Sequence, residues 1–324
     1  MLEKVDLTKK ISKEEYKAKM PQMEIELGRL QRECRELKIP VMIVFEGFGA
    51  SGKGVQIGKL IQSMDPRGFQ VFPIKAETED ERMHPFLWRF WTKTPEAGRI
   101  AIFDGSWYRK VLIDRFEKRT REKEIETAFH SIEAFEKQLT DGGTILVKLL
   151  LDIDQKEQKK RFEKLLEKKE TAWRVSQGDR ERNAKYSEYA AMMEEVLYRS
   201  DTKSAPWTVI EATDRRFATV KIYMTVIHAL AEAVEAVQRR RMEEQAIKAA
   251  EQVSGQQEAA EIMRQAGGEL EMLQSSVLSR ADLTLAYGKE EYEKRLKKLQ
   301  KKIEKLHGEV YRRRIPVLSK LHTQ

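Results

Sequence analysis

The chain has 324 residues, of which 40% are hydrophobic and 35% are charged, and its formal net charge is +8. This length suits one large α/β domain with an appendage, or two smaller domains. The positive charge favours an anionic partner, but a nucleotide, polyphosphate, nucleic acid or an acidic membrane would each satisfy it. Cys34 is the single cysteine, which excludes an internal disulfide and a zinc site built from cysteines.

The N-terminal sequence MLEKVDLTKK does not have the pattern of a signal peptide, and no run of about 18 apolar residues stands out. We therefore predict a cytoplasmic protein that does not bind a membrane.

Five short apolar runs are typical of buried parallel strands. They lie at residues 41–45, 69–74, 100–104, 144–151 and 207–212. Segments with helical periodicity separate them, among them residues 13–38 and 55–64. This alternation predicts an α/β fold with three layers, in which helices cover both faces of a mainly parallel sheet.

The helical segments also predict how the chain is divided. A phosphate-binding α/β domain is expected over residues 1–237, and residues 154–200 within it are almost wholly helical and basic in their first half. That segment is either a mobile lid or a solvated helical hairpin. Residues 238–277 are low in aromatic residues and rich in Glu and Gln, so we predict a helical linker, and the rest forms a helical C-terminal extension.

The C-terminal extension repeats the start of the chain. Residues 2–41 align without a gap to residues 278–317, with 13 identities over 40 positions. The sequence VDLTKKISKEEY at residues 5–16 matches ADLTLAYGKEEY at 281–292, and KIPV matches RIPV at the other end. We interpret residues 278–324 as the start of a second, truncated copy of the domain. A single domain with a coincidentally similar C-terminal helix is the alternative.

A glycine-rich loop follows the first predicted strand and reads VFEGFGASGKG at residues 44–54. Its GxxxxGK spacing is typical of phosphate loops, in which backbone N–H groups and a helix N-terminus attract the phosphate. The residues expected to bind phosphate are Gly47, Gly49, Ala50, Ser51, Gly52, Lys53 and Gly54. The lysine adds a full positive charge. Gly54 stands where a Ser or Thr usually binds magnesium, so the magnesium ligand must be sought elsewhere.

Two further residues are candidates for the chemistry. Asp104 ends the third predicted strand beside the loop, where such folds hold magnesium, and it could equally cap a helix. Arg89 lies within the aromatic sequence HPFLWRFW and needs an anionic partner, either a structural carboxylate or a phosphate chain. The five histidines are scattered, which gives no support to a catalytic triad.

Six ordered motifs together resemble the polyphosphate kinase type 2 family. They are FEGxxxxGKG, DPRGF at 65–69, TEDE…HPFLWRFW at 78–91, FDxSWY at 103–108, KEQ at 156–158 and APWxVI at 205–210. The resemblance covers about residues 5–235. It implies a P-loop kinase-like fold, with Mg²⁺, that moves phosphoryl groups between inorganic polyphosphate and a nucleotide. The repeat makes the chain similar to tandem-domain polyphosphate:AMP phosphotransferases.

The same resemblance assigns roles to residues. It implies that Lys53 lies on the phosphates, that Asp104 holds the metal, and that the helical lid guides polyphosphate through Lys159, Lys160, Arg161 and Arg174. Our candidate catalytic residues are Lys53, Asp104 and Arg89. The family usually has an aspartate where this chain has Gly49, and an arginine where it has Gly105. Loss of two charged groups that stabilise phosphoryl transfer predicts a weakened or inactive copy.

Three functions therefore stay open. The first is an enzyme that transfers phosphoryl groups from polyphosphate, AMP to ADP being the expected reaction. The second is a non-catalytic anion-binding domain that supports an active C-terminal copy. The third is an ATP-dependent nucleoside monophosphate kinase, which fits the fold but not the FDxSWY and WRFW motifs. We expect inorganic polyphosphate and AMP/ADP as partners, no nucleic acid, no membrane, and a homo-oligomer.

Overall fold

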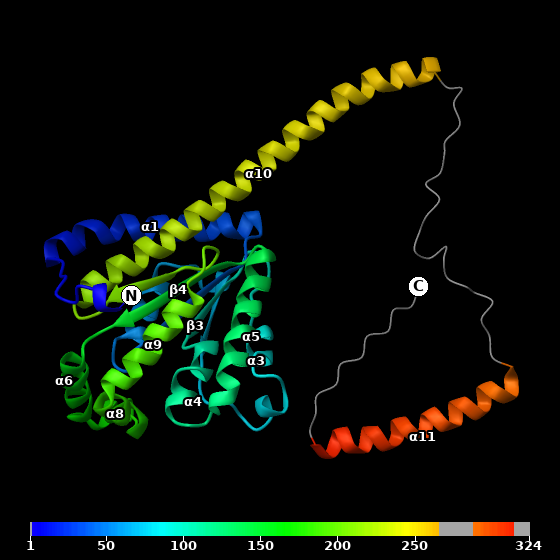
Figure 1. The fold of residues 1–324 in the computed structure, drawn as a ribbon. Coiled ribbons are helices and arrows are strands. Elements are labelled where there is room, and N and C mark those ends of the chain that lie inside the picture. Colours follow the sequence, from blue (N-terminus) through cyan, green and yellow to red (C-terminus); the bar gives the residue numbers. More distant parts are fainter. Residues whose placement is uncertain (1, 266–287, 314–324) are drawn as a thin grey trace. The chain divides into compact units, whose positions relative to one another are not determined.

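A five-stranded parallel sheet forms the centre of the protein. The computed structural model describes residues 2–265 and 288–313 (Figure 1). The strand order is β2-β3-β1-β4-β5, and all four strand pairs are parallel, as the apolar runs predicted. The strands are β1 (Val41–Gly47), β2 (Phe69–Pro73), β3 (Ile100–Asp104), β4 (Ile145–Asp152) and β5 (Trp207–Glu211).

Helices complete three layers, so the α/β/α prediction is confirmed. Figure 1 shows α1 and α10 on one side of the sheet and α5 and α9 on the other. The helices before β4 are α1 (Lys13–Leu37), α2 (Lys53–Gln62), α3 (Trp88–Trp91), α4 (Ile113–Phe116) and α5 (Glu122–Asp141). Those after it are α6 (Gln155–Leu166), α7 (Lys169–Ala172), α8 (Gln177–Ala184), α9 (Tyr186–Ser200), α10 (Arg215–Gln265) and α11 (Lys289–Arg313).

Helix boundaries follow local signals. Ser12 caps α1 in a capping box with Glu15, and Lys38 ends it in the left-handed region at φ 61°. Helix α2 begins at Lys53, two residues before the predicted start, because Gly52 takes the N-cap position. Strand β1 likewise continues through Glu46 and Gly47, which pair with β4.

Helix α10 leaves the domain as one continuous helix into the predicted linker. An 18-residue window within Arg215–Ile247 has a mean hydropathy of 1.3, so this helix is apolar and long enough to cross a membrane by those two measures. This finding rests on mean hydropathy and length and not on an unbroken apolar run, so it leaves the expectation from the sequence untested. Half of the window is buried within the protein, where Ile222, Tyr223 and Val226 join the core, so a core helix would have the same composition.

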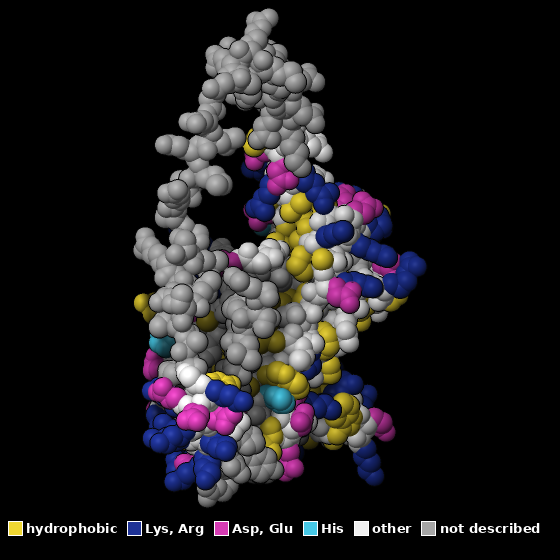
Figure 2. All heavy atoms as spheres, turned by 90° about the vertical axis from the view of Figure 1, so that its right-hand side faces the viewer, with side chains coloured by type: hydrophobic (Ala, Val, Ile, Leu, Met, Phe, Trp, Pro, Cys, Tyr) yellow, Lys and Arg dark blue, Asp and Glu magenta, His cyan; other side chains and the backbone are white. Residues whose placement is uncertain are grey.

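Two compact units divide the chain, and the first, residues 1–78 and 86–242, holds the whole sheet. Predicted linker residues 266–277 and repeat residues 278–287 and 314–324 lie outside the described residues. On one face of the molecule, Lys and Arg side chains are interspersed with Asp and Glu (Figure 2).

Helix α11 carries the same apolar stripe as α1. The α1 stripe is Tyr16, Met20, Met23, Leu27, Leu30 and Cys34, all packed into or against the core. At the repeat spacing of 276 residues, α11 has Tyr292, Leu296, Leu299, Ile303, Leu306 and Val310. The first five of these are 37–64% exposed. The repeat therefore extends to the core-forming positions, but only the α1 stripe is covered.

Leu27 and its repeat partner Ile303 should respond differently to truncation. Leu27 is fully buried, so Leu27→Ala should lower the free energy of unfolding by about 3 kcal/mol. Ile303 is 64% exposed, so Ile303→Ala should change it by less than about 0.5 kcal/mol. Urea denaturation of both variants checks this pair. An equal loss in Ile303→Ala would mean that the α11 stripe is covered in solution.

Candidate functional site: a phosphate loop at the edge of the sheet

The phosphate loop begins at the end of β1, where this strand pairs with β4. Gly47 has a φ of +133°, and a Cβ atom there would lie 2.2 Å from the Leu151 carbonyl oxygen. Only glycine therefore allows the chain to turn out of the sheet at this point. Ala50 also lies in the left-handed region, at φ +57°, so the loop curls tightly before α2.

The N-terminus of α2 faces this loop without a side-chain cap. Gly52, its N-cap residue, has a φ of +105° and provides no side chain to accept the first N–H groups. Such N–H groups and the partial positive charge of the helix favour an anion. Lys53 Nζ donates to the carbonyl oxygens of Gly47 at 2.8 Å and Phe48 at 3.3 Å, so the predicted lysine lies over the loop. Gly54 has open space beside it.

Helix α6 holds the outside of the loop. Gln158 Nε2 donates to the Gly49 carbonyl oxygen at 3.1 Å. The guanidinium of Arg161 donates to the carbonyl oxygens of Ala50 and Ser51, at 3.1 and 3.0 Å. It also donates to those of Ala212 and Thr213, after β5, at 2.8 and 3.0 Å, and its Nε pairs with Glu157.

Arg161 is therefore buried and fully engaged, which corrects its predicted role as a residue that guides polyphosphate. It holds the loop to the sheet instead. Sequence reasoning missed Gln158 as a residue of the site, although it belongs to the KEQ motif.

Helix α9 closes another side of the loop. The ring of Phe48 stacks on Tyr186 with centroids 4.7 Å apart and meets Tyr189 edge-on at 6.0 Å. Tyr189, Met193 and Leu197 of α9 belong to the hydrophobic core. The predicted helical lid, residues 154–200, is therefore too long, because its last helix is a core element.

The remaining basic residues of the predicted lid lie at the surface. Lys159, Lys160 and Arg174 are exposed. Lys160 approaches Glu157 at 3.7 Å, and Arg174 stacks over the ring of Trp173, which is itself 76% exposed. The structure is compatible with an encounter between these residues and a polyanion, and that role stays a prediction.

The end of β3 brings a second set of polar groups to the loop. Asp104 lies opposite Phe45 of β1, and the Gly105 N–H donates to the Phe45 carbonyl oxygen at 2.9 Å. Ser106 Oγ donates to Glu46 at 2.7 Å. Burial raises the pKa of Glu46, although Ser106 and the charge of Lys53 act against that rise, and the charge of Asp104 adds to it. The charges of Lys53 and Asp104, predicted from separate motifs, thus both act on one buried carboxyl group.

The donor set fits a magnesium ion that is shared with a phosphate. Among residues 2–265 and 288–313, no group of three or more His, Cys, Asp or Glu side chains could hold a metal ion. Mg²⁺ is usually bound by one or two carboxylates together with phosphates and water, which Asp104 can satisfy. Ser51 Oγ is buried in the loop and has no hydrogen-bond partner among the residues that the structure describes, so the loop also retains an unused oxygen.

Arg89 lines a small cavity beside the β3 loop. Its Nη1 donates to the Lys75 carbonyl oxygen at 3.1 Å. Arg109 and Lys110 line the same cavity, and Arg109 Nε lies 3.3 Å from Asp114. Sequence reasoning missed this pair of basic residues, although both follow directly on FDxSWY. The cavity thus gathers three basic side chains, together with the carboxyl groups of Glu77 and Asp114.

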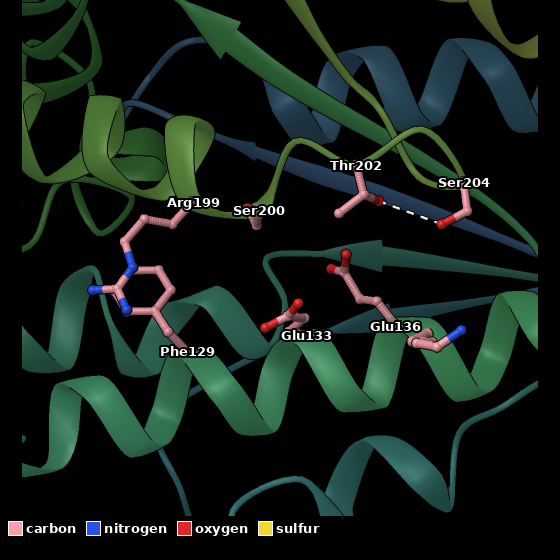
Figure 3. Close-up of a pocket in the computed structure, with 8 residues that line it drawn as sticks. Phe129, Glu133, Glu136, Arg199, Ser200, Thr202 and Ser204 are labelled. Atoms are coloured by element: carbon pink, nitrogen blue, oxygen red, sulfur yellow. Dashed lines mark hydrogen bonds between the residues drawn. The ribbon is translucent and has the colours of Figure 1, made fainter.

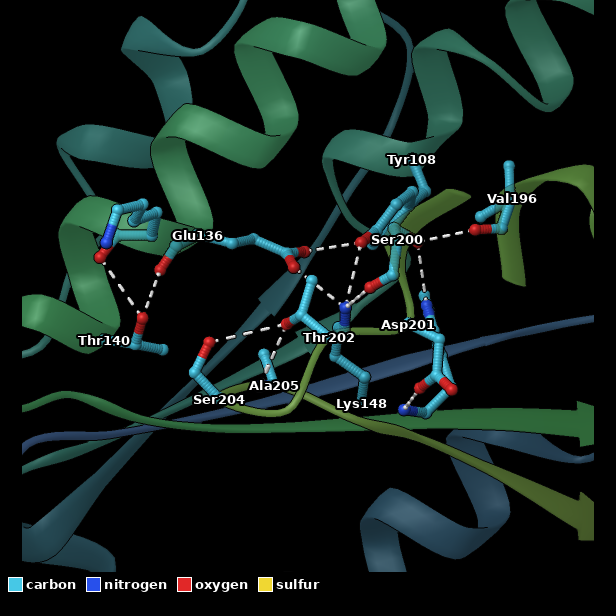
Figure 4. A network of polar contacts seen from close by, with 12 residues as sticks. Tyr108, Glu136, Thr140, Lys148, Val196, Ser200, Asp201, Thr202, Ser204 and Ala205 are labelled. Atoms are coloured by element: carbon cyan, nitrogen blue, oxygen red, sulfur yellow. Dashed lines mark hydrogen bonds and ion pairs between the residues drawn. The ribbon is translucent and has the colours of Figure 1, made fainter. Parts of the chain in front are cut away.

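A larger cavity of about 120 Å³ lies near the N-terminal end of β5 (Figure 3). Glu136 and Ser200 line it, together with Thr202 and Ser204, which precede that strand. Glu136 already accepts hydrogen bonds from Trp107, Tyr108 and Lys148. Figure 4 shows its contacts with Tyr108 and Lys148. The polar groups of this network already pair with one another inside the protein, so we do not assign the cavity to the phosphate site.

Asp152 at the end of β4 predicts a pH dependence of stability. Burial raises the pKa of Asp152 to about 6, above the value of about 3.9 expected in the unfolded chain. Between these pH values the folded state keeps a proton that the unfolded state has lost, so stability falls as pH rises. Asp152→Asn should therefore stabilise the protein by roughly 1–3 kcal/mol at pH 8 and have little effect at pH 4.

Thermal unfolding at the two pH values measures this difference. An equal change in melting temperature at pH 4 and pH 8 would show that the carboxyl group does not titrate in this way.

The sequence profile described as Polyphosphate kinase 2 (PPK2) matches residues 10–240. The chain belongs to the polyphosphate kinase 2 family. This confirms the resemblance drawn from the six motifs. The matched residues include the phosphate loop, Asp104 and the Arg89 cavity, whereas α11 lies outside them.

Polyphosphate kinase 2 relatives agree in sequence and in structure. A polyphosphate:AMP phosphotransferase of Pseudomonas syringae pv. tomato is 36% identical over 233 residues, which are 72% of this chain and 47% of the relative. The solved polyphosphate kinase 2 of Pseudomonas aeruginosa PA01 has a TM-score of 0.70 at 35% identity, over 72% of this chain and 50% of that chain. That of Arthrobacter aurescens TC1 has a TM-score of 0.68 at 30% identity, over 72% and 85%. The chain spans about half the length of the curated polyphosphate:AMP phosphotransferases it matches.

Proposed function

We propose that this chain binds inorganic polyphosphate and transfers phosphoryl groups between it and a nucleotide, with AMP to ADP as the expected direction. The observation that carries the proposal is the phosphate loop. Gly47 turns it out of the sheet, the uncapped N-terminus of α2 faces it, and Lys53 lies over it. Relatives named polyphosphate:AMP phosphotransferase support the choice of substrates.

One part of the proposed site would bind the phosphate donor, and another part would bind the acceptor. In the loop, backbone N–H groups and Lys53 would hold the terminal phosphates of the donor. Arg89, Arg109 and Lys110 would receive the anionic acceptor beside β3. Asp104 would hold Mg²⁺, which neutralises charge on the transferred phosphoryl group when it is bound. The α6 contacts would keep the loop in place throughout.

Lys53→Ala should reduce ADP formation by about 100-fold or more, because one full charge on the phosphates is lost. The assay mixes the purified chain with AMP, long-chain polyphosphate and magnesium, and follows ADP. Lys59→Ala is a matched control, because Lys59 is exposed on the same helix. If both variants lost activity equally, or neither did, Lys53 would not be the phosphate ligand.

A second candidate function is an anion-binding domain with little turnover, and two glycines favour it. Gly49 and Gly105 stand where the resembled family has charged residues. Gly105 has a φ of +75°, a region that costs a side chain about 1 kcal/mol or more. An arginine would thus be strained in this loop conformation. Binding of tripolyphosphate without ADP formation would support this second function and overturn the first.

The remaining expectations concern assembly and location. We infer a homo-oligomer that acts in the cytoplasm without nucleic acid or membrane partners. Its mass in solution, measured by light scattering, tests the first of these: a strictly monomeric chain would contradict it.

A further inference from the structure

Side chains from two other helices fill the space beside Gly49 of the phosphate loop. A Cβ atom built on Gly49 would lie 2.8 Å from Asp179 Oδ1 and 3.2 Å from Phe162 Cζ. Asp179 belongs to α8 and Phe162 to α6, so both helices close over the loop at a residue that lacks a side chain. The carboxylate of Asp179 therefore occupies the space that a side chain at position 49 would need.

Asp179 is held firmly in this place. Its Oδ2 accepts hydrogen bonds from Ser176 N at 3.0 Å and Ser176 Oγ at 2.6 Å, in the capping box of α8. Its Oδ1 accepts one from Arg182 Nη2 at 2.8 Å, and Arg182 in turn donates to Glu117 at 2.7 Å. A carboxylate has about four acceptor positions, so these three bonds leave one on the side of Oδ1.

The charge state suits a cation. Burial acts to raise the pKa of Asp179, but the hydrogen bonds from Ser176 and Arg182 outweigh it and keep the pKa below its usual value. The carboxylate is therefore ionised at neutral pH.

We propose that Asp179 is the carboxylate of the phosphate loop, which α8 delivers beside Gly49 to hold the hydrated divalent cation that accompanies a bound phosphate chain. This rests on the proposed binding of polyphosphate. Without a cation, a negative group here would only repel the phosphates. Glycine at position 49 is then the residue that admits Asp179. It also follows that Gly49→Asp cannot be accommodated without moving Asp179, because its Cβ atom would lie 2.8 Å from Asp179 Oδ1.

The test is calorimetric titration of the full chain with tripolyphosphate, once with magnesium and once with EDTA. Magnesium should tighten binding by about tenfold in the wild type. Asp179→Asn should lose that gain and keep its affinity in EDTA. Glu181→Gln, an exposed carboxylate on the same helix, should keep the gain. Gly49→Asp should lose the gain in affinity with magnesium. Gly49→Asp/Asp179→Asn should recover that gain, because a single carboxylate, now at position 49, is then present.

The outcomes separate this inference from the proposed function. A wild type that binds no tripolyphosphate in either buffer overturns both. If Asp179→Asn retains the full magnesium gain, Asp179 does not hold the cation, while polyphosphate binding stands.

Discussion

Gly47→Ala should destabilise the protein more than any other single methyl addition in the phosphate loop, by on the order of 5 kcal/mol. The added Cβ would lie 2.2, 2.7 and 2.9 Å from the carbonyl oxygen, nitrogen and carbonyl carbon of Leu151. These are backbone atoms of the neighbouring strand β4, so they cannot rotate away. The φ of +133° adds strain for any residue with a Cβ atom. Relief would require β1 to separate from β4, which would also displace the loop that follows.

Gly54→Ala is the matched control for this prediction. Gly54 lies in the first turn of α2 with no atom within 4 Å of its Cβ position, so the same methyl group should cause no clash. Alanine favours a helix over glycine by about 0.5–1 kcal/mol, and a small gain in stability is expected. Urea denaturation measures both changes. If the two variants were equally stable, Gly47 would not lie as close to β4 as described.

Lys148→Met should lower the free energy of unfolding by about 4 kcal/mol, because it leaves a carboxylate buried without its cation. Lys148 is fully buried in the middle of β4, and its Nζ lies 2.8 Å from Glu136 Oε2 (Figure 4). Nζ also donates to the Ser200 carbonyl oxygen at 2.6 Å. Burial lowers the pKa of Lys148, and the charge of Glu136 opposes that fall.

The double variant Lys148→Met/Glu136→Leu tests whether the pair acts as a unit. It removes both charges, so its loss should be smaller than the sum of the two single losses by about 1–3 kcal/mol. Full recovery is not expected, since Trp107 Nε1 and Tyr108 OH also donate to Glu136. Urea denaturation of the three variants measures the coupling. Strict additivity would show that the two side chains do not interact in solution.

The sequence predicted those features of the fold that depend on neighbouring residues. Apolar runs placed all five strands to within two residues at either end, because burial on both faces requires unbroken apolar sequence. The loop was recognised from glycine spacing, because residues with positive φ favour glycine. Ordered motifs were enough to assign the family.

Side-chain roles depended on distance in space and were predicted less well. Arg161 is surrounded by lysines in the sequence, which favoured an exposed basic residue. In the structure its guanidinium donates to the carbonyl oxygens of residues 50, 51, 212 and 213. Each of these residues is more than 50 positions away from Arg161 in the sequence. Periodicity could not reveal this, because it reports which side of a helix is buried but not against which segment.

By itself, then, the sequence determined the α/β class, the phosphate loop and the family of this protein. The tertiary structure decided what surrounds that loop, because the strand order β2-β3-β1-β4-β5 brings the ends of β1, β3 and β4 together at one edge. Asp179 shows the difference most clearly. Its sequence context, SQGD, indicates only a helix cap, and its contact with Gly49 arises from packing across 130 residues of chain. Local sequence sets backbone conformation, whereas the position of a charge beside a phosphate site depends on how whole elements pack.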